Sequence, residues 1–404
     1  MNLLFFTTNK ISPTMGGVEN ATLRIAQELH THYHCKCYSA FYCNNNSPDF
    51  GCFEEEILVS GRDLISELYQ IIRAYSIDVV LSESLFEVTI CVDKLRKESK
   101  LSLGNVFVHH FAPGWESNFF KIKHYMDVVK LSKGMDKITS SIRFIFYPYF
   151  RLRYLHRIPV QYRYCYQAAD KVVLLSSSFI SLYENEGRFK DSSKFEIISN
   201  CLMLDEFYPR EKLPEKKHIA LIVARLDEIQ KRISLALKIW KEVKRHAQAK
   251  DWVLNIVGGG DTRFYENLIK QQGIKDVNLL GRQIPNKYYK ESSIFLMTSK
   301  SEGFALTLIE AQQMGVVPIA FDSYPALKDI ISNKENGIIV PECNVDDYVD
   351  KLLWLMEHSS DRKEMASKAL DTVHKFDKDT ISAKWYNLLV EVMNLTEDYA
   401  ILRN

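Results

Sequence analysis

The stretch from Ile294 to Phe321 constrains the fold more than any other part of this sequence. It begins with the apolar run Ile294-Phe-Leu-Met297 and ends with Val316-Val-Pro-Ile-Ala-Phe321, and each run is typical of a buried strand. The apolar residues between the runs follow the spacing of a helix: Phe304, Leu308, Ile309 and Ala311. A strand, a helix and a second strand in this order predict a βαβ unit, and a βαβ unit requires a parallel sheet.

The junction of loop and helix in this unit predicts an anion site. We expect the first free N–H groups of the helix near Gly303, Phe304 and Ala305, where the positive end of the helix dipole favours negative charge. Glu302 precedes them in the loop, and Glu310 lies inside the helix, where its carboxylate can accept hydrogen bonds from hydroxyls. Phosphate beside hydroxyls describes a nucleotide or a sugar phosphate. The alternative is that Glu302 and Glu310 are solvated loop and helix residues.

The same stretch resembles the Glu-x7-Glu motif of the retaining GT-B glycosyltransferases of family 4. The resemblance covers Glu302-Gly-Phe-Ala-Leu-Thr-Leu-Ile-Glu310-Ala, then Gly315 and Pro318. It implies that Glu310 holds the ribose hydroxyls of a nucleotide-sugar donor and that Glu302 orients the hydroxyls of the donor sugar. It also implies that the N–H groups near Gly303, Phe304 and Ala305 contact the donor diphosphate.

Composition limits the class of protein. The chain has 404 residues, 46% of them hydrophobic, which is enough for two domains with substantial cores. A formal net charge of +1 argues against general nucleic-acid binding. The apolar start Leu3-Leu-Phe-Phe6 is too short for a signal peptide, and no apolar run approaches a membrane span, so we expect a cytosolic protein.

Eight cysteines fit a reducing compartment better than a metal centre. Cys35-Lys-Cys37 lies near His30, His32 and His34, but no second Cys/His pair follows at the spacing of a zinc site. We therefore expect reduced thiols, mostly buried, and no metal or cofactor.

The first half of the chain alternates strand-like and helical segments. Strands are predicted at 3–6, 36–42, 57–60, 77–82, 105–109 and 170–176, and helices at 62–75 and 87–97, with a loop at 7–15 and an amphipathic helix after it. Gly16-Gly17-Val18-Glu19 stands between the first strand and that helix. A glycine pair alone is typical of many turns, but this one resembles the N-terminal glycine loop of the same family. The resemblance implies that Gly16 and Gly17 lie beside the acceptor and Gly17 beside the donor phosphates.

A histidine pair stands at the end of the predicted strand 105–109. The run His109-His110-Phe-Ala-Pro113 places a histidine at the carboxyl end of a strand, where ligands bind in parallel sheets and where its titration near neutral pH is useful. The run resembles the family's His-x-x-Pro loop, in which a histidine touches the donor sugar or the acceptor, and His110 has the right spacing to Pro113. His109 is the second choice, and a surface histidine without a role is the alternative.

Residues 121–164 carry ten basic and two acidic residues, a net charge of +8 in a chain whose total is +1. Aromatic residues lie between the charges, among them Phe144, Phe146, Tyr147, Tyr149, Phe150, Tyr154, Tyr162 and Tyr164. Such a segment can lie on an anionic membrane surface, which would suit a lipid-linked acceptor. The alternative is a solvated helical hairpin whose Lys and Arg stems cover apolar surface.

The second half carries the remaining donor residues. Arg225 and Lys231 follow the predicted strand Ile219–Ala224, and two cations there suit a diphosphate, although ordinary surface charge is the alternative. They resemble the family's Arg…Lys pair that holds the donor pyrophosphate, with one more residue between them than is common. Gly258-Gly259-Gly260-Asp261 resembles the family's glycine turn at the donor, and Val277–Arg282 resembles the stretch near the base. Gly258 and Arg282 are therefore expected at the donor.

The resemblance implies a GT-B fold, with two Rossmann-like doubly wound α/β domains facing a cleft. We predict an acceptor-binding domain at 1–205, joined by the last helix at about 380–404, and a nucleotide-sugar-binding domain at 206–379. Helical patterns at 345–357 and 379–395 close the chain.

The implied reaction is transfer of a glycosyl group, with retention, from a nucleotide-diphosphate sugar to a glycan or lipid-linked acceptor in cell-surface polysaccharide synthesis. Family frequency favours UDP over GDP. The catalytic set is His110, Arg225, Lys231 and Glu302, whose cations can stabilise the leaving diphosphate without a metal. The Asp377-Lys-Asp379 sequence is better explained as a helix start than as a metal site. We expect peripheral association with the inner face of the plasma membrane.

Three other functions compete with this one. A glycosidase needs two carboxyl groups facing each other across a bond, and Glu310, inside a helix, is poorly placed for that. Another GT-B enzyme, such as a nucleotide-sugar epimerase, would form its product without an acceptor. A non-catalytic partner would bind nucleotide sugar or glycan and leave it unconverted.

Overall fold

The computed structural model describes the chain except for residues 13–15, 46, 49, 117–121, 133 and 403–404, and it omits the side chains at 123, 124, 127, 131 and 397–402. The chain divides into two compact units. The first unit comprises Met1–Cys201 and Lys378–Asn404, and the second comprises Leu202–Asp377. Each unit contains one sheet, and each sheet is parallel throughout its described pairings.

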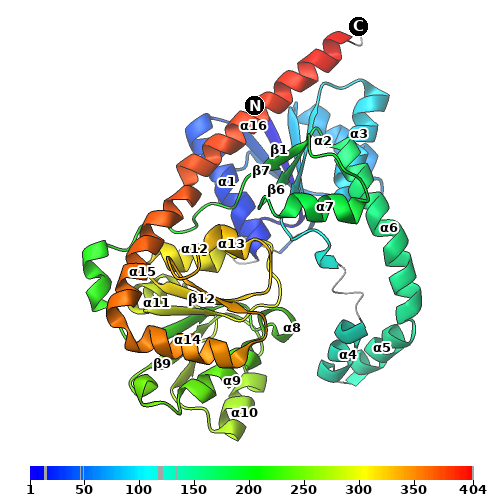
Figure 1. Cartoon of the computed structure of the whole chain (residues 1–404). Coiled ribbons are helices and arrows are strands. Elements are labelled where there is room, and N and C mark those ends of the chain that lie inside the picture. The colour runs from blue at the N-terminus through cyan, green and yellow to red at the C-terminus, as the bar shows by residue number, and fades with distance from the viewer. Residues whose placement is uncertain (13–15, 46, 49, 117–121, 133, 403–404) are drawn as a thin grey trace. The chain divides into compact units, whose positions relative to one another are not determined.

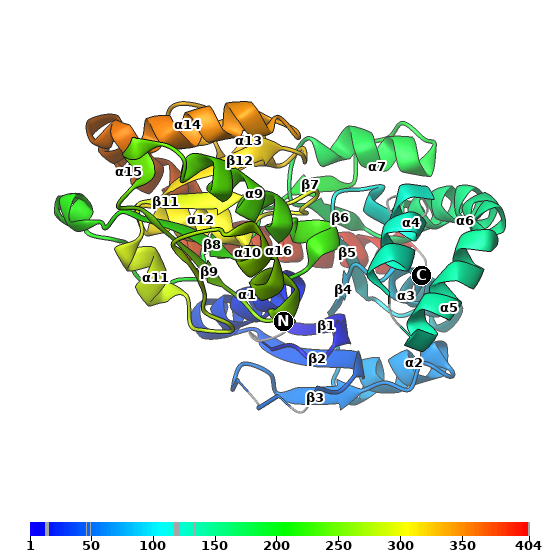
Figure 2. The ribbon, with the colours of Figure 1, turned by 90° about the horizontal axis from the view of Figure 1, so that it is seen from below.

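The first unit is built on a seven-stranded sheet of order β3-β2-β1-β4-β5-β6-β7, and Figure 2 shows β3, β2 and β1 side by side at one end of it. Its strands are β1 (Asn2–Asn9), β2 (Lys36–Cys43), β3 (Glu55–Leu58), β4 (Val79–Glu83), β5 (Gly104–His109), β6 (Lys171–Leu174) and β7 (Phe195–Ile197). Its helices are α1 (Gly17–Tyr33), α2 (Leu64–Ala74), α3 (Phe86–Ser99), α4 (Ile122–Leu131), α5 (Gly134–Ile145), α6 (Tyr147–Ala168), α7 (Phe179–Gly187) and α16 (Lys378–Leu402).

Both faces of this sheet are covered by helices (Figure 1). Successive side chains of a strand point to opposite faces, so Leu4 and Phe6 of β1 join a core cluster with α2 and α3. Phe5, between them, faces a pocket lined by residues of α1 and α16. The continuous apolar run at the start of the chain is therefore a strand buried on both sides, as expected for a parallel sheet.

The second unit is built on a six-stranded sheet of order β10-β9-β8-β11-β12-β13. Its strands are β8 (Ile219–Val223), β9 (Val253–Val257), β10 (Val277–Leu279), β11 (Ile294–Met297), β12 (Val317–Asp322) and β13 (Ile338–Pro341). Its α-helices are α8 (Glu228–Lys231), α9 (Ile233–Val243), α10 (Arg263–Gln272), α11 (Asn286–Glu291), α12 (Leu306–Gln313), α13 (Leu327–Ile330), α14 (Val345–Glu357) and α15 (Ser359–Thr372). Three short 3-10 helices are Arg210–Glu215, Ala247–Ala249 and Val373–Phe376.

One large core cluster holds the second unit together. It joins alternate residues of β8, β11 and β12 to the apolar faces of α9 and α14, and it includes the fully buried Trp240 and Trp252. Burying large apolar side chains of this kind contributes roughly 1.5–3 kcal/mol each. This core fixes the strands whose carboxyl ends carry the loops described below.

The doubly wound α/β class predicted from the sequence is confirmed in both sheets. Two local predictions were wrong. β1 continues to Asn9 through pairing with β2, so the predicted loop at 7–15 begins later. The helix after β11 begins at Leu306, not near Gly303. The helix α15 was not predicted, because its apolar positions are few. No helix in the described part of the chain is both long enough and apolar enough to span a bilayer.

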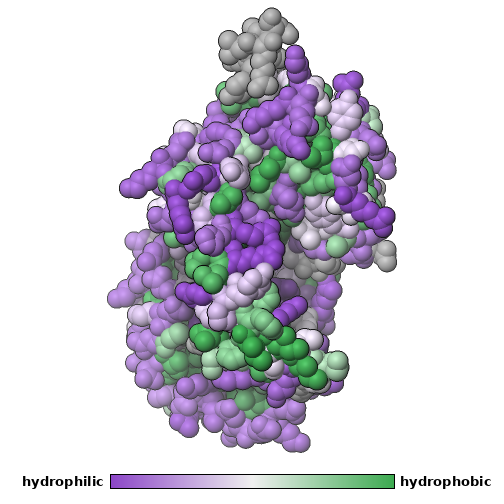
Figure 3. All heavy atoms as spheres, turned by 90° about the vertical axis from the view of Figure 1, so that its right-hand side faces the viewer, coloured by the Kyte–Doolittle hydropathy of each residue, from purple (hydrophilic) through white to green (hydrophobic). Residues whose placement is uncertain are grey.

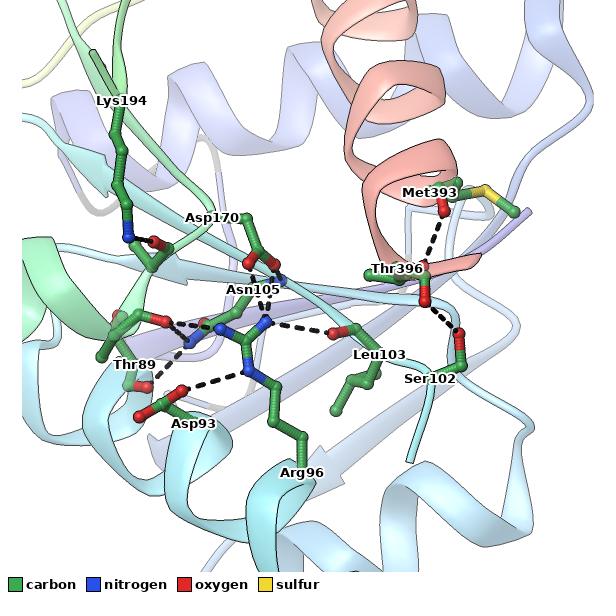
Figure 4. Close-up of polar contacts among 12 residues, drawn as sticks. Thr89, Asp93, Arg96, Ser102, Leu103, Asn105, Asp170, Lys194, Met393 and Thr396 are labelled. Carbon is green, nitrogen blue, oxygen red and sulfur yellow. Dashed lines mark hydrogen bonds and ion pairs between the residues drawn. The ribbon is translucent and has the colours of Figure 1, made fainter. Parts of the chain in front are cut away.

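A nearly buried ion pair links α3, β5 and β6 in the first unit (Figure 4). The Arg96 guanidinium donates to both carboxylate oxygens of Asp170, at 2.8 and 2.7 Å, and to the carbonyl of Ala168 at 3.0 Å. Asp170 also accepts from the Asn105 N–H at 2.9 Å. This network holds β5 in place, and the His110 loop follows that strand.

Replacing Asp170 with alanine should destabilise the first unit by about 1–3 kcal/mol, because Arg96 and the Asn105 N–H lose their hydrogen bonds to its carboxylate, while Asp93, 3.2 Å from Arg96 Nε, still balances part of the charge. Hydrogen exchange of the β5 and β6 amides measures this locally. Lys94→Ala, on the same helix, breaks the exposed pair with Glu98 and should change exchange by less than about 1 kcal/mol. Equal protection in Asp170→Ala and the wild-type protein would contradict the role given to the pair.

Candidate functional site

Lys231 and Glu302 meet in the second unit. Lys231 ends α8, and Glu302 lies in the loop between β11 and α12. The Lys231 Nζ donates to Glu302 Oε1 at 2.5 Å, and the two side chains are only 17% and 10% exposed. The sequence predicted both residues for one site, and the structure joins them in a single ion pair. A pair so enclosed holds its ammonium group in a defined position.

Polar contacts around α8 fix this pair. Asp227 caps α8 by accepting from the N–H groups of Ile229 and Gln230, at 3.0 and 3.2 Å. Arg232, in the left-handed backbone region at φ 51°, donates to the carbonyls of Thr298 and Ser299, at 2.6 and 2.9 Å. The α8 segment is thus fastened to the end of β11. No sequence pattern indicated Arg232, because only the folded chain brings it to these carbonyls.

Arg225 lies just past β8, on the same edge of the sheet. Its guanidinium donates to Gln230 Oε1 at a long 3.4 Å, so it is held near α8 without a carboxylate partner among its described contacts. The turn after β9 needs glycine at position 258, because a Cβ there would lie 1.7 Å from the carbonyl oxygen of Ala224. Gly258 therefore allows the loops after β8 and β9 to touch, whatever ligand lies above them.

The start of α12 presents free backbone donors at this edge. In the part of the chain that the structure describes, the N–H groups of Gly303, Phe304 and Ala305 donate no backbone hydrogen bond, and Ala305 is the uncapped residue before the helix. Phe304 is buried against Phe376, with ring centroids 5.4 Å apart. Its apolar character thus reflects burial from the loop, which explains why the sequence placed the helix start too early. The N–H groups on which the prediction of an anion site depends therefore lie in the loop and at the residue before the helix.

Glu310 lies one turn further along α12 and meets a residue that the sequence did not indicate. The Tyr289 hydroxyl donates to Glu310 Oε2 at 2.9 Å. Burial raises the pKa of Glu310, and the hydrogen bond from Tyr289 opposes that shift. Tyr289 fixes one carboxylate oxygen, so the other is left to accept from a ligand.

Arg282 follows β10 and is exposed, after Gly281 at φ 64°. The backbone around it closes on the glycine turn, since Gly258 donates its N–H to the carbonyl of Gly281 at 2.8 Å. Arg282 and Gly258 therefore lie on neighbouring loops of one sheet edge.

In the first unit, His110 pairs with Glu83. The two side chains make a short contact between Nε2 and Oε2, and both are almost fully buried. The His110 N–H also donates to Ser84 Oγ at 3.0 Å, which fixes the start of the loop. The His110 Nδ1 atom is buried and has no hydrogen-bond partner among the described residues. A carboxylate on one ring nitrogen leaves the other to interact with a ligand.

Glu83 is a site residue that the sequence reasoning missed, although a signal existed. It ends β4, which neighbours β5 in the sheet, so its carboxylate and His110 meet at adjacent carboxyl ends. Both residues line a pocket with Thr22 of α1 and with Ser199 and Asn200 after β7. Gly16 and Gly17, at the start of α1, lead into this same edge.

His109, the second choice, has a different environment. It is 1% exposed and packs edge-on against Tyr162 and Tyr183, with ring centroids 5.6 and 5.7 Å away. Burial lowers the pKa of His109 to about 3, so the ring stays neutral. Tyr162, its neighbour, accepts from the N–H of Gly114 at 3.0 Å and donates to Glu116. His109 therefore belongs to the core that supports the loop.

One group of described residues could hold a metal ion by distance alone. Ligand atoms of Glu28, His32 and Asp379 lie within 4.8 Å of one another. Arg24 Nε and Lys378 Nζ lie 3.6 and 3.7 Å from Glu28 Oε1, so two cations already balance the carboxylates there. We assign no metal to this group.

The cysteines suggested as ligands are unsuited to metal binding. Cys35 and Cys37 are free and buried, and burial raises the pKa of both thiols. A protonated thiol is a poor ligand, because metal binding requires the thiolate. Three further cysteines are buried, Cys52, Cys165 and Cys201, while Cys43 and Cys343 are exposed.

Known proteins resemble this chain in sequence and in fold. Residues 205–372 match the family model described as "Glycosyl transferases group 1". An amylovoran biosynthesis glycosyltransferase, AmsD, of Erwinia amylovora is 29% identical over 239 residues, covering 56% of this chain and 64% of its own length. An uncharacterized glycosyltransferase of Haemophilus influenzae is 27% identical over 223 residues, covering 54% of this chain and 61% of its own length.

A third relative, from Campylobacter jejuni, is 29% identical over 247 residues, covering 60% of this chain and 64% of its own length. Its name describes an alpha-1,4-N-acetyl-D-galactosaminyltransferase acting on a diNAcBac-PP-undecaprenol-linked glycan. The matched part of this chain thus spans somewhat over three fifths of the curated relatives.

Solved structures match over nearly the whole chain. The lipopolysaccharide outer core galactosyltransferase WaaB, in its apo form, has a TM-score of 0.67 at 18% identity and covers 97% of this chain and 99% of its own. Anabaena HepE in complex with UDP-glucose has a TM-score of 0.70 at 14% identity and covers 97% and 100%. These likenesses show the fold alone, and they confirm the GT-B fold class expected from the sequence.

Replacing Glu83 with glutamine should release the proton of His110 from its fixed position. A carboxylate only accepts, so in the wild-type protein Nε2 carries a proton; an amide can accept or donate, so both tautomers become populated. Nitrogen-15 chemical shifts of the His110 ring report this directly. Glu87→Gln, at an exposed position of α3, is the matched control. Identical His110 shifts in Glu83→Gln and the control would refute the pairing.

Proposed function

We infer that the chain is a glycosyltransferase of the hexosyltransferase type, because residues 205–372 match the family model described as "Glycosyl transferases group 1". We propose that it moves a sugar, with retention, from a nucleotide-diphosphate sugar to a glycan or polyprenyl-linked acceptor in cell-surface polysaccharide synthesis. UDP-sugars are the favoured donors and GDP-sugars the second. The names of the relatives support this setting, since one serves amylovoran biosynthesis and another acts on an undecaprenol-linked glycan.

The strongest support for this reaction is the pairing of Lys231 with Glu302 beside the free N–H groups that precede α12. Departure of a nucleoside diphosphate leaves negative charge on its phosphate oxygens. Lys231, Arg225 and the N–H groups of Gly303, Phe304 and Ala305 would contact that charge. Donors held in place before the reaction stabilise such charge best, because they need little reorganisation.

The two glutamates have separate tasks in this proposal. Glu310, fixed on one side by Tyr289, would accept hydrogen bonds from the ribose hydroxyls. Glu302 would orient Lys231 and accept from hydroxyls of the donor sugar. Gly258 would let the diphosphate approach the backbone, and Arg282 would lie near the base. We assign neither glutamate the role of nucleophile, since each already has a hydrogen-bonded partner.

The first unit would bind the acceptor. Gly16 and Gly17 would leave room for it, with Gly17 also near the donor phosphates, and His110 would contact an acceptor or donor hydroxyl through Nδ1. Lys231 and Arg225 supply the positive charge that a divalent cation supplies elsewhere, so we propose a metal-independent reaction with no cofactor. We also propose that the protein works on the cytoplasmic side, at the inner face of the plasma membrane.

Two other functions stay distinguishable by their products. A GT-B epimerase would change the donor sugar without any acceptor. A non-catalytic partner would bind the donor and leave it unconverted. Donor consumption with and without a glycan acceptor separates both from transfer.

Lys231→Ala and Glu302→Ala should each lower turnover by about 100-fold or more, because each removes a group held against the leaving diphosphate or the donor sugar. The measurement is release of nucleoside diphosphate in the presence of acceptor. Lys238→Ala, at an exposed position of α9, is the control and should keep wild-type turnover. Wild-type rates in either site variant would remove its assigned role.

Nucleoside diphosphates should raise the melting temperature of the protein without a metal. At about 100 times its Kd, a ligand adds roughly 2.7 kcal/mol to the stability of the folded protein. UDP, GDP and ADP are compared by thermal shift, each with and without EDTA. We expect UDP to give the largest shift and EDTA to leave it unchanged. A shift that disappears with EDTA would contradict the metal-independent site.

A further inference from the structure

Exposed apolar side chains are concentrated on one part of the first unit. In the described part of the chain, 13 of the 18 large apolar side chains that are exposed lie from Ile122 to Tyr164, on α4, α5 and α6 and at Phe146 between the last two. Soluble proteins rarely expose so many large apolar groups together, and such patches mark surfaces that another body covers. Figure 3 views the molecule from the side on which Figure 1 shows α6, and green side chains lie there among purple ones.

Helix α5 shows how these side chains are arranged. Met135, Ile138, Ile142 and Ile145 follow one another at steps of three or four residues, which aligns them along one side of the helix. In a globular core such a stripe would be buried. Here all four are exposed, with Met135 at 74% and Ile145 at 70%. The stripe on α5 therefore lacks a partner among the described residues.

The first part of α6 continues this surface. Its exposed apolar residues include Tyr149, Leu152 and Leu155, and the residue before the helix, Phe146, is exposed as well. Tyr154 is already buried in this part, and further along the helix Tyr162, Cys165 and Tyr166 are buried in the first unit, while Val160 and Tyr164 stay exposed. Pro159 lies inside the helix between the two parts. Because proline removes a helix hydrogen bond, the helix can bend there, between its anchored and its exposed part.

The charge of this surface indicates its partner. We define the arm as residues 134–158, which are α5 and the exposed part of α6. It carries the basic residues Lys137, Arg143, Arg151, Arg153 and Arg157 and one acidic residue, Asp136, a net charge of +4. All six are exposed. Lys121, Lys123, Asp127 and Lys133, which the sequence analysis counted in the same basic segment, lie outside the described side chains.

We propose that the arm docks on an anionic lipid bilayer, with its apolar side chains in the interface and its arginines on the lipid headgroups. Isoleucine, leucine and phenylalanine beside arginine and tyrosine are the composition of helices that lie in the plane of a membrane. An acidic protein partner would match the charge, but it would leave the isoleucine stripe of α5 without an apolar phase. A second copy of the chain would match the stripe and bring like charges together.

The anchored end of α6 connects the arm to the His110 loop. The Tyr162 hydroxyl accepts from the N–H of Gly114, four residues after His110, and donates to Glu116. A docked arm would thus hold the His110 loop at a set distance from the bilayer surface. This extends the proposed function by placing that site near a membrane-bound acceptor, but docking itself needs no donor chemistry.

The test is co-sedimentation of the purified full chain with vesicles of phosphatidylcholine alone and of phosphatidylcholine with one third phosphatidylglycerol. We expect at least about tenfold stronger binding to the anionic vesicles, weakened by salt, because each arginine near the surface adds several-fold. Equal binding to both vesicle types, or no binding to either, would overturn the proposal.

Two variants and two matched controls distinguish the contribution of charge to vesicle binding from that of the apolar stripe. Arg151→Glu/Arg153→Glu/Arg157→Glu and Ile138→Ser/Ile142→Ser/Ile145→Ser should each weaken binding by about tenfold or more. Arg245→Glu/Lys250→Glu/Lys270→Glu and Phe264→Ser/Ile284→Ser make the same kinds of change at exposed positions of the second unit. These controls should stay within about twofold of the wild-type protein. Controls that lose binding as strongly would overturn the assignment to the arm.

Sedimentation velocity tests the second-copy alternative. If the isoleucine variant turns a dimer into a monomer and keeps its vesicle binding, the stripe is a dimer interface and the proposal is wrong. Turnover on a water-soluble acceptor should be unchanged in the arm variants. Vesicle binding and turnover are therefore separate measurements. Loss of the first contradicts the docking proposal without affecting the proposed glycosyl transfer, and loss of the second does the opposite.

Discussion

Parallel strand pairing is the constraint on which everything else in this protein depends. A parallel strand must be followed by a crossover that brings the chain back to the same end, so all carboxyl ends lie along one edge of the sheet. In the second unit this edge gathers Arg225, Lys231, Gly258 and Glu302 from positions up to 77 residues apart in the sequence. In the first unit it gathers Glu83 and His110. The functional groups thus meet because of topology, before any specific contact forms.

Electrostatics then refines what topology brings together. Lys231 and Glu302 neutralise each other in an enclosed pair, and Asp227 and Arg232 fasten the short helix that carries the lysine. Such a short helix has little stability of its own. Its position therefore comes from these contacts with the loop after β11. An ammonium group held in this way can contact an anion without losing much side-chain freedom, which is what stabilising a leaving diphosphate requires.

The arm formed by α5 and the start of α6 follows a different principle. The sheets bury nearly every apolar residue that their strands carry, whereas the arm leaves a whole stripe exposed. Within α6, near Pro159, the apolar side chains change from mostly exposed to mostly buried. Tyr162, only three residues further on, is already part of the core around His109. Helix α6 therefore connects an exposed surface suited to lipid with the residues that support the His110 loop.

The sequence by itself determined the parallel α/β architecture, because short continuous apolar runs alternating with helical periodicity have few other solutions. It also determined which residue types stand at the carboxyl ends of strands, including His110, Arg225, Lys231 and Glu302. It could not determine partners that lie far apart in the chain. Glu83, Tyr289 and Arg232 acquire their roles only through contacts across 27, 21 and 66 residues.

Where the local sequence pattern of a residue and its burial disagree, only the tertiary structure decided the role of that residue. Phe304 is apolar because it packs on Phe376 from a loop, so helical spacing placed the start of α12 too early. His109 and His110 are neighbours in sequence, but His109 ends β5 and packs in an aromatic core, whereas His110 begins the following loop and pairs with a carboxylate. The sequence limited the choice to these two histidines. Only the packing around each one showed that His109 supports the loop and that His110 is the candidate site residue.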